Sequence, residues 1–537
     1  MARGGVPLAS WSTASRSVAR NCYPSHLPRA CHRCLGAPLT DVLPPDQAAQ
    51  LGRLVDVYPE ARELGERFVA AGHELHLVGG TVRDTLLAGG DQQELSEVDL
   101  DFATSASPEE TERVVGPWAT AVWLTGADYG TVSCQRQVEG RPLRRIEITT
   151  YRSDAYEPGS RHPKVTYGES IEADLSRRDL TVNAMAVRVP EFRFVDPYGG
   201  LRDLHRGVLR TPIDPHTSFA DDPLRMVRLA RFAAVLDGEA DPAAVAAATA
   251  MADELATISA ERVRDELVRL ITGQRPRRGI QLLLRTGLMG YVIPELVELR
   301  ECRDPIHRHK DVYLHTLAVV ENAMGLEGDE PDFVLRFAAL MHDIGKPDTK
   351  EVHHDGAVSF HHHDVVGARM TRHRMRELRF DKQTTKDVSE LVRMHLRFHT
   401  YKQGWTDAAV RRYVRDAGHL YEKLNALTRA DVTTGNPKRA ARIQRRVDEL
   451  EERVERLREQ EELEAMRPPI DGNRIMSHLG IRPGPVVGEA WNHLLELRLD
   501  RGAMSEAEAL AALDVWWAER QAREDGAEVD AATDDGA

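Results

Sequence analysis

Five consecutive residues, Val98-Asp99-Leu100-Asp101-Phe102, alternate between apolar and acidic side chains. In an extended strand, successive side chains point to opposite faces, so the two aspartates share one face and the three apolar residues share the other. Two neighbouring carboxylates repel each other unless a cation lies between them, and oxygen ligands suit a hard ion such as Mg²⁺. The pattern predicts a strand with an apolar back and a metal-binding front. A surface strand with two solvated aspartates is the alternative.

An apolar run from Leu75 to Val78 ends in Gly79-Gly80 and precedes a helical pattern. This order predicts a strand, a tight glycine turn and a helix. Two residues without side chains let backbone N–H groups approach a phosphate closely, and the helix N-terminus favours negative charge. Many Gly-Gly pairs are only turns. Directly before an acidic strand, however, the turn favours a nucleotidyl-transfer site, in which one element holds a triphosphate and the next holds its metal ions.

Four motifs occur in a fixed order, namely Gly79-Gly80-Thr81-Val82-Arg83-Asp84, Asp99-x-Asp101, Arg177-Arg178-Asp179-Leu180-Thr181-Val182-Asn183-Ala184-Met185-Ala186, and Asp221-Asp222-Pro223-Leu224-Arg225-Met226-Val227-Arg228. In this order they resemble the polymerase-β-type nucleotidyltransferases, and more narrowly the class II CCA-adding tRNA nucleotidyltransferases and their bacterial poly(A) polymerase relatives. The resemblance implies addition of C, C and A to the 3′ end of tRNA from CTP and ATP, with Mg²⁺ in a two-metal mechanism. A poly(A) polymerase has the same motifs and stays open.

The resemblance also implies roles for individual residues. Polymerase-β-type sites commonly use a third carboxylate, and Glu147 is the candidate because it alternates with two isoleucines in Arg145-Ile146-Glu147-Ile148-Thr149; a strand glutamate paired with an arginine is the alternative. Arg178 would bind triphosphate oxygens and Asp179 the ribose. The full set of implied nucleotide-binding residues is Gly79, Gly80, Arg83, Arg178, Asp179, Asp222, Arg225 and Arg228.

The block around Asp222 and Arg225 is where we expect the base to be selected. On a helix, residues three apart share a face, so a carboxylate acceptor and a guanidinium donor would be presented together. Cytosine and adenine both carry an exocyclic amine beside an unprotonated ring nitrogen, whereas uracil and guanine present the opposite polarity. The family pattern usually begins this block with Glu, but Asp221 stands here, and a helix-capping acid is its alternative reading.

A second constellation lies downstream and resembles the HD phosphohydrolases, whose histidines and aspartates bind divalent metal. Its members are His315, His342, Asp343, His363, His395 and Asp431. Helical context would place these side chains inward on a bundle, and nitrogen ligands favour Mn²⁺, Ni²⁺ or Co²⁺ over Mg²⁺. A degenerate HD-like fold used only as scaffold is the alternative for this region. An HD phosphohydrolase with a vestigial head is a competing function for the chain, but it predicts loss of the head carboxylates.

The distribution of strands and helices predicts an α/β nucleotidyltransferase head with a small mixed sheet, followed by an elongated all-α body that includes an HD-type helical domain. We expect a disordered extension at 1–45, the head at 46–190, a helical neck for base and RNA binding at 191–300, the HD-type domain at 301–435, a tRNA-binding helical tail at 436–520 and a disordered acidic tail at 521–537. A repeat of Ile443, Val447, Leu450, Val454 and Leu457 predicts an amphipathic helix that opens at Pro437.

A formal net charge of −14 argues against a nucleic-acid partner only if the charge is evenly spread. Arginine clusters occur at Arg411-Arg412-Arg415 and between Lys438 and Arg446, and local basic stripes carry phosphate contacts; they could equally be solvated helix faces. The C-x-x-C of Cys31 and Cys34 lacks a second pair and is read as incidental. No apolar run reaches about 18 residues, so we expect no membrane span. The five cysteines are scattered, which favours a reduced cytoplasmic setting, and we expect no obligate protein partner.

Overall fold

The computed structural model describes residues 52, 58–87, 99–126, 130–138, 143–155, 164–167, 170–302, 312–354, 357–399, 404–434, 436–461 and 468–534. The expected extension at 1–45 with its C-x-x-C, Val98 of the acidic strand, and residues 535–537 lie outside this description. The chain forms two compact units, residues 1–150 with 185–197, and residues 151–184 with 198–537. The boundary differs from the expected head at 46–190, because residues 151–184 group with the second unit.

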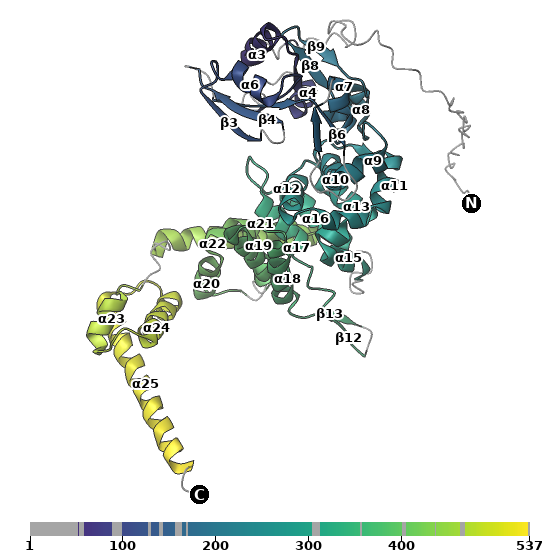
Figure 1. Cartoon of the computed structure of the whole chain (residues 1–537). Helices are drawn as coiled ribbons and strands as arrows, with labels where there is room; N and C mark the ends of the chain where they lie inside the picture. Colours follow the sequence, from purple (N-terminus) through teal and green to yellow (C-terminus); the bar gives the residue numbers. More distant parts are fainter. Residues whose placement is uncertain are drawn as a thin grey trace, which may run out of the picture. The chain divides into compact units, whose positions relative to one another are not determined.

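The first unit is built on a seven-stranded mixed sheet (Figure 1). The strands in spatial order are β3 (Ala121–Gly126), β4 (Thr131–Arg136), β5 (Arg144–Thr150), β2 (Leu100–Thr104), β1 (Leu75–Val78), β8 (Ala186–Val189) and β9 (Arg193–Val195). Only the β2–β5 pair is parallel. Leu100 and Phe102 are buried while Asp101 between them is exposed. The alternation predicted for this strand is confirmed.

Among the described residues, three helices pack on this sheet, namely α3 (Pro59–Ala70), α4 (Gly80–Leu87) and α6 (Pro108–Val115). The start of α6 is fixed by a capping box. The hydroxyl of Ser107 accepts from the backbone N–H of Glu110, and the Glu110 carboxylate accepts from the backbone N–H of Ser107. Pro108 occupies the first helical position, where its missing N–H costs nothing.

The second unit is dominated by helices, with three two-stranded pairs, so the predicted α/β head and all-α body are confirmed. Its first helices are α7 (Ile171–Ser176), α8 (Gly200–Arg206), α9 (Pro215–Asp221), α10 (Leu224–Val235), α11 (Pro242–Ala250), α12 (Ala260–Ile271), α13 (Pro276–Arg285), α14 (Met289–Val292) and α15 (Pro294–Glu301). The HD-type region contains α16 (Val312–Met324), α17 (Phe333–Met341), α18 (His363–Glu377), α19 (Lys382–Met394), α20 (Asp407–Ala417), α21 (Tyr421–Ala430) and α22 (Pro437–Glu461). The small pairs are β6 (Arg152–Ala155) with β7 (Lys164–Tyr167), β10 (Val208–Leu209) with β11 (Glu239–Ala240), and β12 (Lys350–Val352) with β13 (Val358–Phe360).

One hydrophobic core runs through this unit from Leu180 to Leu457. It includes Val447, Leu450 and Val454 of α22, which confirms the predicted amphipathic helix and its packing on its own chain. Helix α22 therefore packs with the HD-type region and not with the later helices of the tail that we expected at 436–520.

A separate small core contains Ile475, Leu494 and Leu513 from α23 (Gly472–Leu479), α24 (Pro485–Arg501) and α25 (Glu506–Asp534). Helix α25 continues to Asp534, so residues 521–534, which we expected to be disordered, are helical. Alanine and glutamate are strong helix formers, and a high acidic content alone does not prevent a helix. In the described part of the chain, no helix combines the length and the apolar character that a membrane crossing requires.

The close approach of α18 to the turn after α17 depends on Gly345. A Cβ atom built there would lie 2.6 Å from the backbone nitrogen of Gly367 and would also clash with the carbonyl oxygen of His363. Because both obstacles are backbone, Gly345→Ala should lower the free energy of unfolding of this region by about 3 kcal/mol, at the upper end for overpacking. Urea unfolding measures the change. Gly290→Ala in α14, where nothing lies within 4 Å, is the control, and equal stability of the two variants would contradict this account.

Candidate active sites

The first unit presents three carboxylates at one end of its sheet. Asp101 of β2 and Glu147 of β5 are paired residues on neighbouring parallel strands, and both side chains are exposed on the same face. Asp99 is also exposed and precedes β2 by one residue, two positions from Asp101. Ile146 and Ile148 flank Glu147 and are fully buried. The arrangement can hold hard cations, since oxygen donors on adjacent strands converge on one surface.

The glycine turn lies at the same end of the sheet as these carboxylates. β1 runs antiparallel to β2, with Leu77 opposite Phe102, so the residues after β1 lie beside the residues at the start of β2. Gly79 has φ +75°, a left-handed conformation that favours glycine, and Gly80 begins α4. The Thr81 hydroxyl donates to the Asp99 carbonyl oxygen at 3.3 Å. The predicted strand, turn and helix are confirmed.

In the second unit, Asp179 is the centre of a buried hydrogen-bond network. Its Oδ1 accepts from the Leu180 backbone N–H at 2.8 Å and from Asn183 Nδ2 at 2.9 Å, and its Oδ2 accepts from Arg228 Nε at 2.8 Å. Burial acts to raise the pKa of Asp179, but Arg228 and these hydrogen bonds hold it below its ordinary value. The carboxylate is therefore ionised and orients Arg228. Arg178 pairs with Asp174 at 3.2 Å.

Glu266 of α12 extends this network and was not expected from the sequence. Its side chain is buried and accepts from Arg228 Nη1 at 2.9 Å, and Arg231 Nε lies 3.1 Å from its other oxygen. Burial and the neighbouring Arg228 lower the pKa of Arg231 to about 10. A glutamate inside an amphipathic helix reads as a surface residue, so only the tertiary structure could reveal its role.

Asp222 and Arg225 do not share a helix face, and that expectation was wrong. Helix α9 ends at Asp221, Asp222 is extended with φ −149° and ψ 100°, and α10 begins at Leu224. The cause is Pro223, because a residue before proline is disfavoured in the α region. Instead Asp222 lies in the turn before α10, where its Oδ1 accepts from the Leu224 N–H at 3.2 Å.

The side chains at this helix junction already have protein partners. Asp222 Oδ2 accepts from Arg262 Nη2 at 2.8 Å. Arg225 Nη1 donates to the carbonyl oxygen and the hydroxyl of Ser218 at 2.9 and 3.0 Å, and Nη2 donates to the Arg177 carbonyl oxygen. Arg225 is thus held rigidly, whereas Asp222 is tied to Arg262, a side chain that is half exposed.

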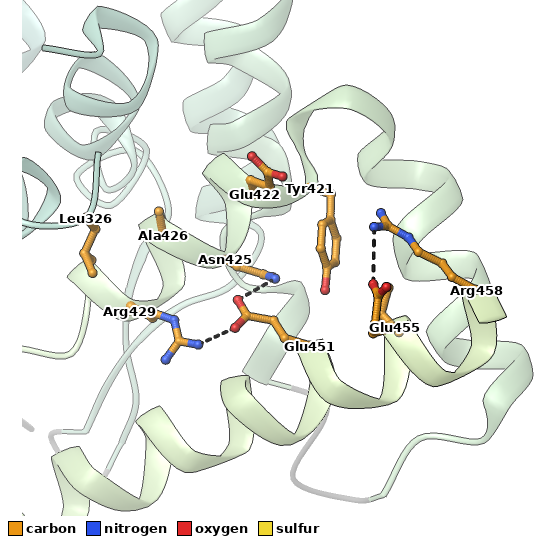
Figure 2. Close-up of a pocket in the computed structure, with 10 residues that line it drawn as sticks. Leu326, Tyr421, Glu422, Asn425, Ala426, Arg429, Glu451, Glu455 and Arg458 are labelled. Atoms are coloured by element: carbon orange, nitrogen blue, oxygen red, sulfur yellow. Dashed lines mark hydrogen bonds and ion pairs between the residues drawn. The ribbon is translucent and has the colours of Figure 1, made fainter. Parts of the chain in front are cut away.

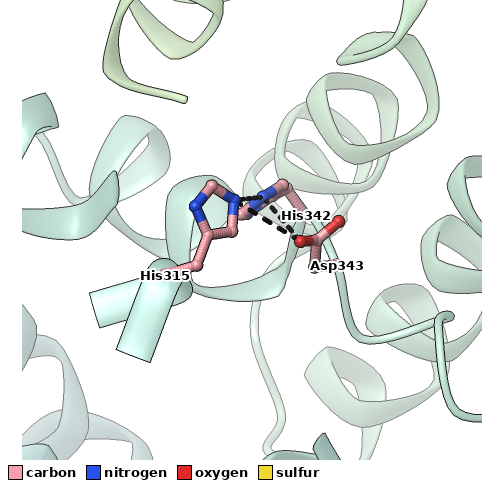
Figure 3. A group of neighbouring side chains, drawn as sticks. All are labelled: His315, His342 and Asp343. Carbon is pink, nitrogen blue, oxygen red and sulfur yellow. Dashed lines mark hydrogen bonds and ion pairs between the residues drawn. The ribbon is translucent and has the colours of Figure 1, made fainter. Parts of the chain in front are cut away.

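The six residues of the second constellation come together in the HD-type region. They follow the carboxylates of the first unit in the chain and differ from them in including four histidines. Figure 3 shows His315, His342 and Asp343 pointing toward one another. His342 Nε2 lies 3.2 Å from Asp343 Oδ2 and 3.3 Å from His315 Nε2. His315 Nε2 lies 3.0 Å from Asp431 Oδ1, and His363 Nε2 lies 3.4 Å from Asp343 Oδ1.

These histidines are oriented by hydrogen bonds on their outer ring nitrogens. The Nδ1 atoms of His342, His363 and His395 each lie 2.7–2.8 Å from the carbonyl oxygen three residues earlier. A carbonyl only accepts, so Nδ1 carries a proton, and Nε2 is the ring nitrogen that faces the cluster and that a metal ion could engage. His315 Nδ1 is held by the Thr433 hydroxyl at 2.7 Å.

Burial and charge suit this cluster to a metal ion. His342, Asp343 and His395 are at most 3 % exposed, as predicted for inward-facing residues. Burial lowers the pKa of His395 to about 3, so its ring is neutral, and its Nε2 is buried without a hydrogen-bond partner. Burial acts to raise the pKa of Asp343, but His342 and Lys346 hold it well below the ordinary value. The two candidate metal-binding groups share Asp343.

Lys346 is a second residue that sequence reasoning missed. Its Nζ donates to Asp343 Oδ2 at 2.7 Å, and it follows Asp343 by three residues. The string His342-Asp343-Ile344-Gly345-Lys346 contained this signal, since a cation one helical turn from an acidic ligand can reach it. Thr433, which orients His315, carried no sequence signal.

Comparison with known families matches three segments of the chain. The family described as Poly A polymerase head domain matches residues 75–210, the probable RNA and SrmB-binding site of polymerase A matches residues 239–299, and the HD domain matches residues 312–453. The nucleotidyltransferase head and the HD domain both imply dependence on divalent metal ions.

Two curated proteins and one solved structure illustrate the similarity. The A-adding tRNA nucleotidyltransferase of Deinococcus radiodurans is 33% identical over 448 residues, covering 82% of this chain and 95% of its own. The CCA-adding enzyme of Levilactobacillus brevis is 35% identical over 283 residues, covering 52% of this chain and 67% of its own. The fold resembles the Bacillus stearothermophilus CCA-adding enzyme in complex with CTP, with a TM-score of 0.61 at 23% identity over 87% of this chain and 99% of that one.

Proposed function

Because this chain belongs to the tRNA nucleotidyltransferase family that contains the A-adding and CCA-adding enzymes, we propose that it adds C, C and A to the 3′ end of tRNA, with CTP and ATP as substrates. It is a nucleotidyltransferase, and the family resemblance stated from its motifs is confirmed. The observation that carries the proposal is the pairing of Asp101 with Glu147 beside the Gly79-Gly80 turn.

In the proposed reaction, Asp99, Asp101 and Glu147 would hold two Mg²⁺ ions. The residues fit such ions, since the three carboxylates are exposed and neither Asp99 nor Glu147 forms an ion pair with a described residue. When bound, the ions would activate the 3′ hydroxyl of the tRNA and neutralise charge on the triphosphate. The chain itself contributes the backbone N–H groups after Gly79, which bind phosphate oxygens. It also contributes Arg83 in the first turn of α4, whose Nε donates to Asp84 Oδ1 at 2.8 Å.

The second unit supplies the nucleotide contacts in this proposal. Arg178 and Arg228 bind the triphosphate and sugar. The contact expected between Asp179 and the ribose is replaced here by a positioning role, because protein donors engage both oxygens of Asp179 and keep Arg228 in place. Asp222 accepts from the exocyclic amine of cytosine or adenine after Arg262 moves aside, and Arg225 donates to the neighbouring ring nitrogen. Uracil and guanine present the opposite polarity to these two groups and would form no matching hydrogen bonds with them, at a cost of ~1–3 kcal/mol.

Arg225→Lys should weaken discrimination more than it slows nucleotide transfer. Lysine retains the charge but not the planar fork that holds Ser218 and Arg177 together. Preference for CTP and ATP over UTP and GTP should fall ~10- to 100-fold, as measured by kcat/KM for each nucleotide. Arg285→Lys on the exposed face of α13 is the matched control. Unchanged exclusion of UTP and GTP would place base recognition elsewhere.

Incubation with single nucleotides tests the main proposal against the poly(A) polymerase alternative. A tRNA lacking its terminal CCA, supplied with Mg²⁺ and one labelled NTP, should accept CTP, and should accept ATP only after CTP has been used. An unrelated single-stranded RNA should accept neither. Long adenylate tails on both RNAs would favour the poly(A) polymerase alternative.

The histidine cluster supports a second proposed activity, metal-dependent hydrolysis of a phosphoester at a damaged tRNA 3′ end. The residues fit a transition metal such as Mn²⁺, Ni²⁺ or Co²⁺, because four imidazoles face two carboxylates and the buried His395 Nε2 has no partner. When bound, the metal would supply an activated water and polarise the phosphate. Lys346 donates to Asp343 and keeps this carboxylate ionised. The hydrogen bond from Nδ1 of His342 to a backbone carbonyl keeps that imidazole aligned. A 2′,3′-cyclic phosphate or a 3′ phosphate is the substrate to test first.

A further inference from the structure

The first eleven residues of α22 carry five cations and no acid. Lys438, Arg439, Arg442 and Arg445 are exposed and Arg446 is partly buried, and we call these five residues the basic segment. Lys438, Arg442 and Arg445 follow one another at steps of four and three, so they form one stripe on the side away from the buried Val447 and Leu450.

The charge order along α22 is opposite to the one that stabilises a helix. Asn436 accepts from the backbone N–H groups of Lys438 and Arg439, which fixes the N-terminus of the helix directly before the cations. Cations near a helix N-terminus destabilise the helix, and like charges four residues apart repel. Helix stability therefore does not explain the basic segment, whereas an external polyanion would offset this cost.

Other arginines of this region have acidic partners within the chain. Arg412 and Arg415 pair with Glu496, and the buried Arg411 donates to the Leu499 carbonyl oxygen. Figure 2 shows Arg429 with Glu451, and Arg458 with Glu455, around the pocket between α21 and α22.

No residue of the basic segment forms an ion pair with any described residue. Of the two arginine clusters evident in the sequence, the one at 411–415 is used internally and the one at 438–446 is available to a partner.

The basic segment lies a short, fixed distance from the histidine cluster. Asp431 and Thr433 both contact His315, and Lys438 follows Thr433 by five residues, a span of at most ~18 Å. The helix cannot swing away, because Arg429 Nη1 donates to Gln444 Oε1 at 3.0 Å and Gln444 Nε2 donates to the Arg429 carbonyl oxygen at 3.4 Å. A polyanion on the segment would thus have its end within reach of the cluster.

We propose that the basic segment binds the phosphate backbone of an RNA whose 3′ end enters the histidine cluster. This inference rests on the hydrolytic activity proposed above. RNA fits better than a membrane surface, because the exposed residues between positions 438 and 446 are four cations of the basic segment and Ala441, with no large apolar side chain to insert. The segment provides affinity independent of sequence, and the histidine cluster provides the chemistry.

The test removes one stripe of charge in the triple variant Lys438→Gln/Arg442→Gln/Arg445→Gln. Because all three side chains are exposed, misfolding would not explain a loss of RNA binding. The control, Arg376→Gln/Lys382→Gln/Lys386→Gln, removes equal charge at the far ends of α18 and α19, ~20 Å along α18 from His363. Each protein is given Ni²⁺, Mn²⁺ or Co²⁺ and either an RNA ending in a 2′,3′-cyclic phosphate or a cyclic mononucleotide.

For the RNA, the stripe variant should show a KM raised ~10-fold or more and a log–log salt slope reduced by ~2, since each lost phosphate contact contributes ~0.7. Hydrolysis of the cyclic mononucleotide should be unchanged, and the control should match the parent in both. An unchanged RNA KM would overturn the proposal. So would equal losses on both substrates, an equal loss of nucleotide addition to tRNA, or loss of binding to anionic vesicles with RNA binding intact.

If the parent hydrolyses neither substrate, the proposed hydrolytic activity is wrong, and the proposed RNA-binding surface is tested by itself. Filter binding of the same RNA to parent and stripe variant then decides the surface alone. Parent binding that is weakened ~10-fold in the stripe variant, and not in the control, supports an RNA surface. Equal affinities of the three proteins overturn it.

Discussion

Asp101→Asn is expected to abolish nucleotide addition while leaving tRNA binding intact. Asparagine keeps the shape of the side chain but removes its negative charge, which we propose binds both metal ions. When bound, those ions would stabilise charge in the transition state, so the rate should fall ~10³-fold or more, which corresponds to about 4 kcal/mol. Single-turnover incorporation of labelled CTP measures the rate, and filter binding measures the affinity for tRNA.

Asp99→Asn should behave in the same way, since Asp99 is two residues from Asp101 and equally exposed. Glu112→Gln on α6 changes an exposed carboxylate of the same unit and should leave the rate unchanged. Incorporation by Asp101→Asn within tenfold of the parent would show that this face of the sheet is not the site of the reaction.

Asp343→Asn is expected to eliminate phosphoester hydrolysis and spare nucleotide addition. Asp343 lies within ion-pair distance of His342, His363 and Lys346, and the two candidate metal groups share it. Loss of one carboxylate should remove the bound metal and reduce hydrolysis by ~10³-fold or more. Elemental analysis and assays with added Mn²⁺, Ni²⁺ or Co²⁺ measure both effects, and a chelator should reproduce the loss in the parent.

Breaking a buried ion pair also destabilises a fold, by about 3–5 kcal/mol. His315→Gln is therefore the second variant, because His315 is partly exposed and lies at the edge of the cluster. It should lose hydrolysis with no change in unfolding midpoint. A parent that binds no metal and hydrolyses no phosphoester would leave the helical domain as scaffold only.

The local patterns of the sequence predicted elements whose side chains alternate or repeat. β2 has the predicted alternation of Leu100, Asp101 and Phe102, and α22 buries the predicted Val447 and Leu450. Both predictions depend only on strand or helix periodicity, which the chain keeps because each element buries one face.

A proline and contacts between distant residues account for the features that were predicted wrongly or not predicted from the sequence. The helix expected across Asp222 is broken by Pro223, a signal that was present in the sequence. The links from Glu266 to Arg228 and from Arg262 to Asp222 join helices far apart in the chain, so no local pattern reports them. The same holds for the arginines at 411–415, whose partners lie some 85 residues away.

The nucleotide sequence of the product tests most directly whether this chain builds a C-C-A end on tRNA. Three transcripts of one tRNA, ending at the position before CCA, after the first C and after the second C, are incubated with all four NTPs and Mg²⁺. Mass spectrometry of the 3′ fragments should find CCA at the end of all three products, with no U, no G and no further A. Products extended only from the transcript that already ends in CC would contradict the account and identify an enzyme that adds A alone.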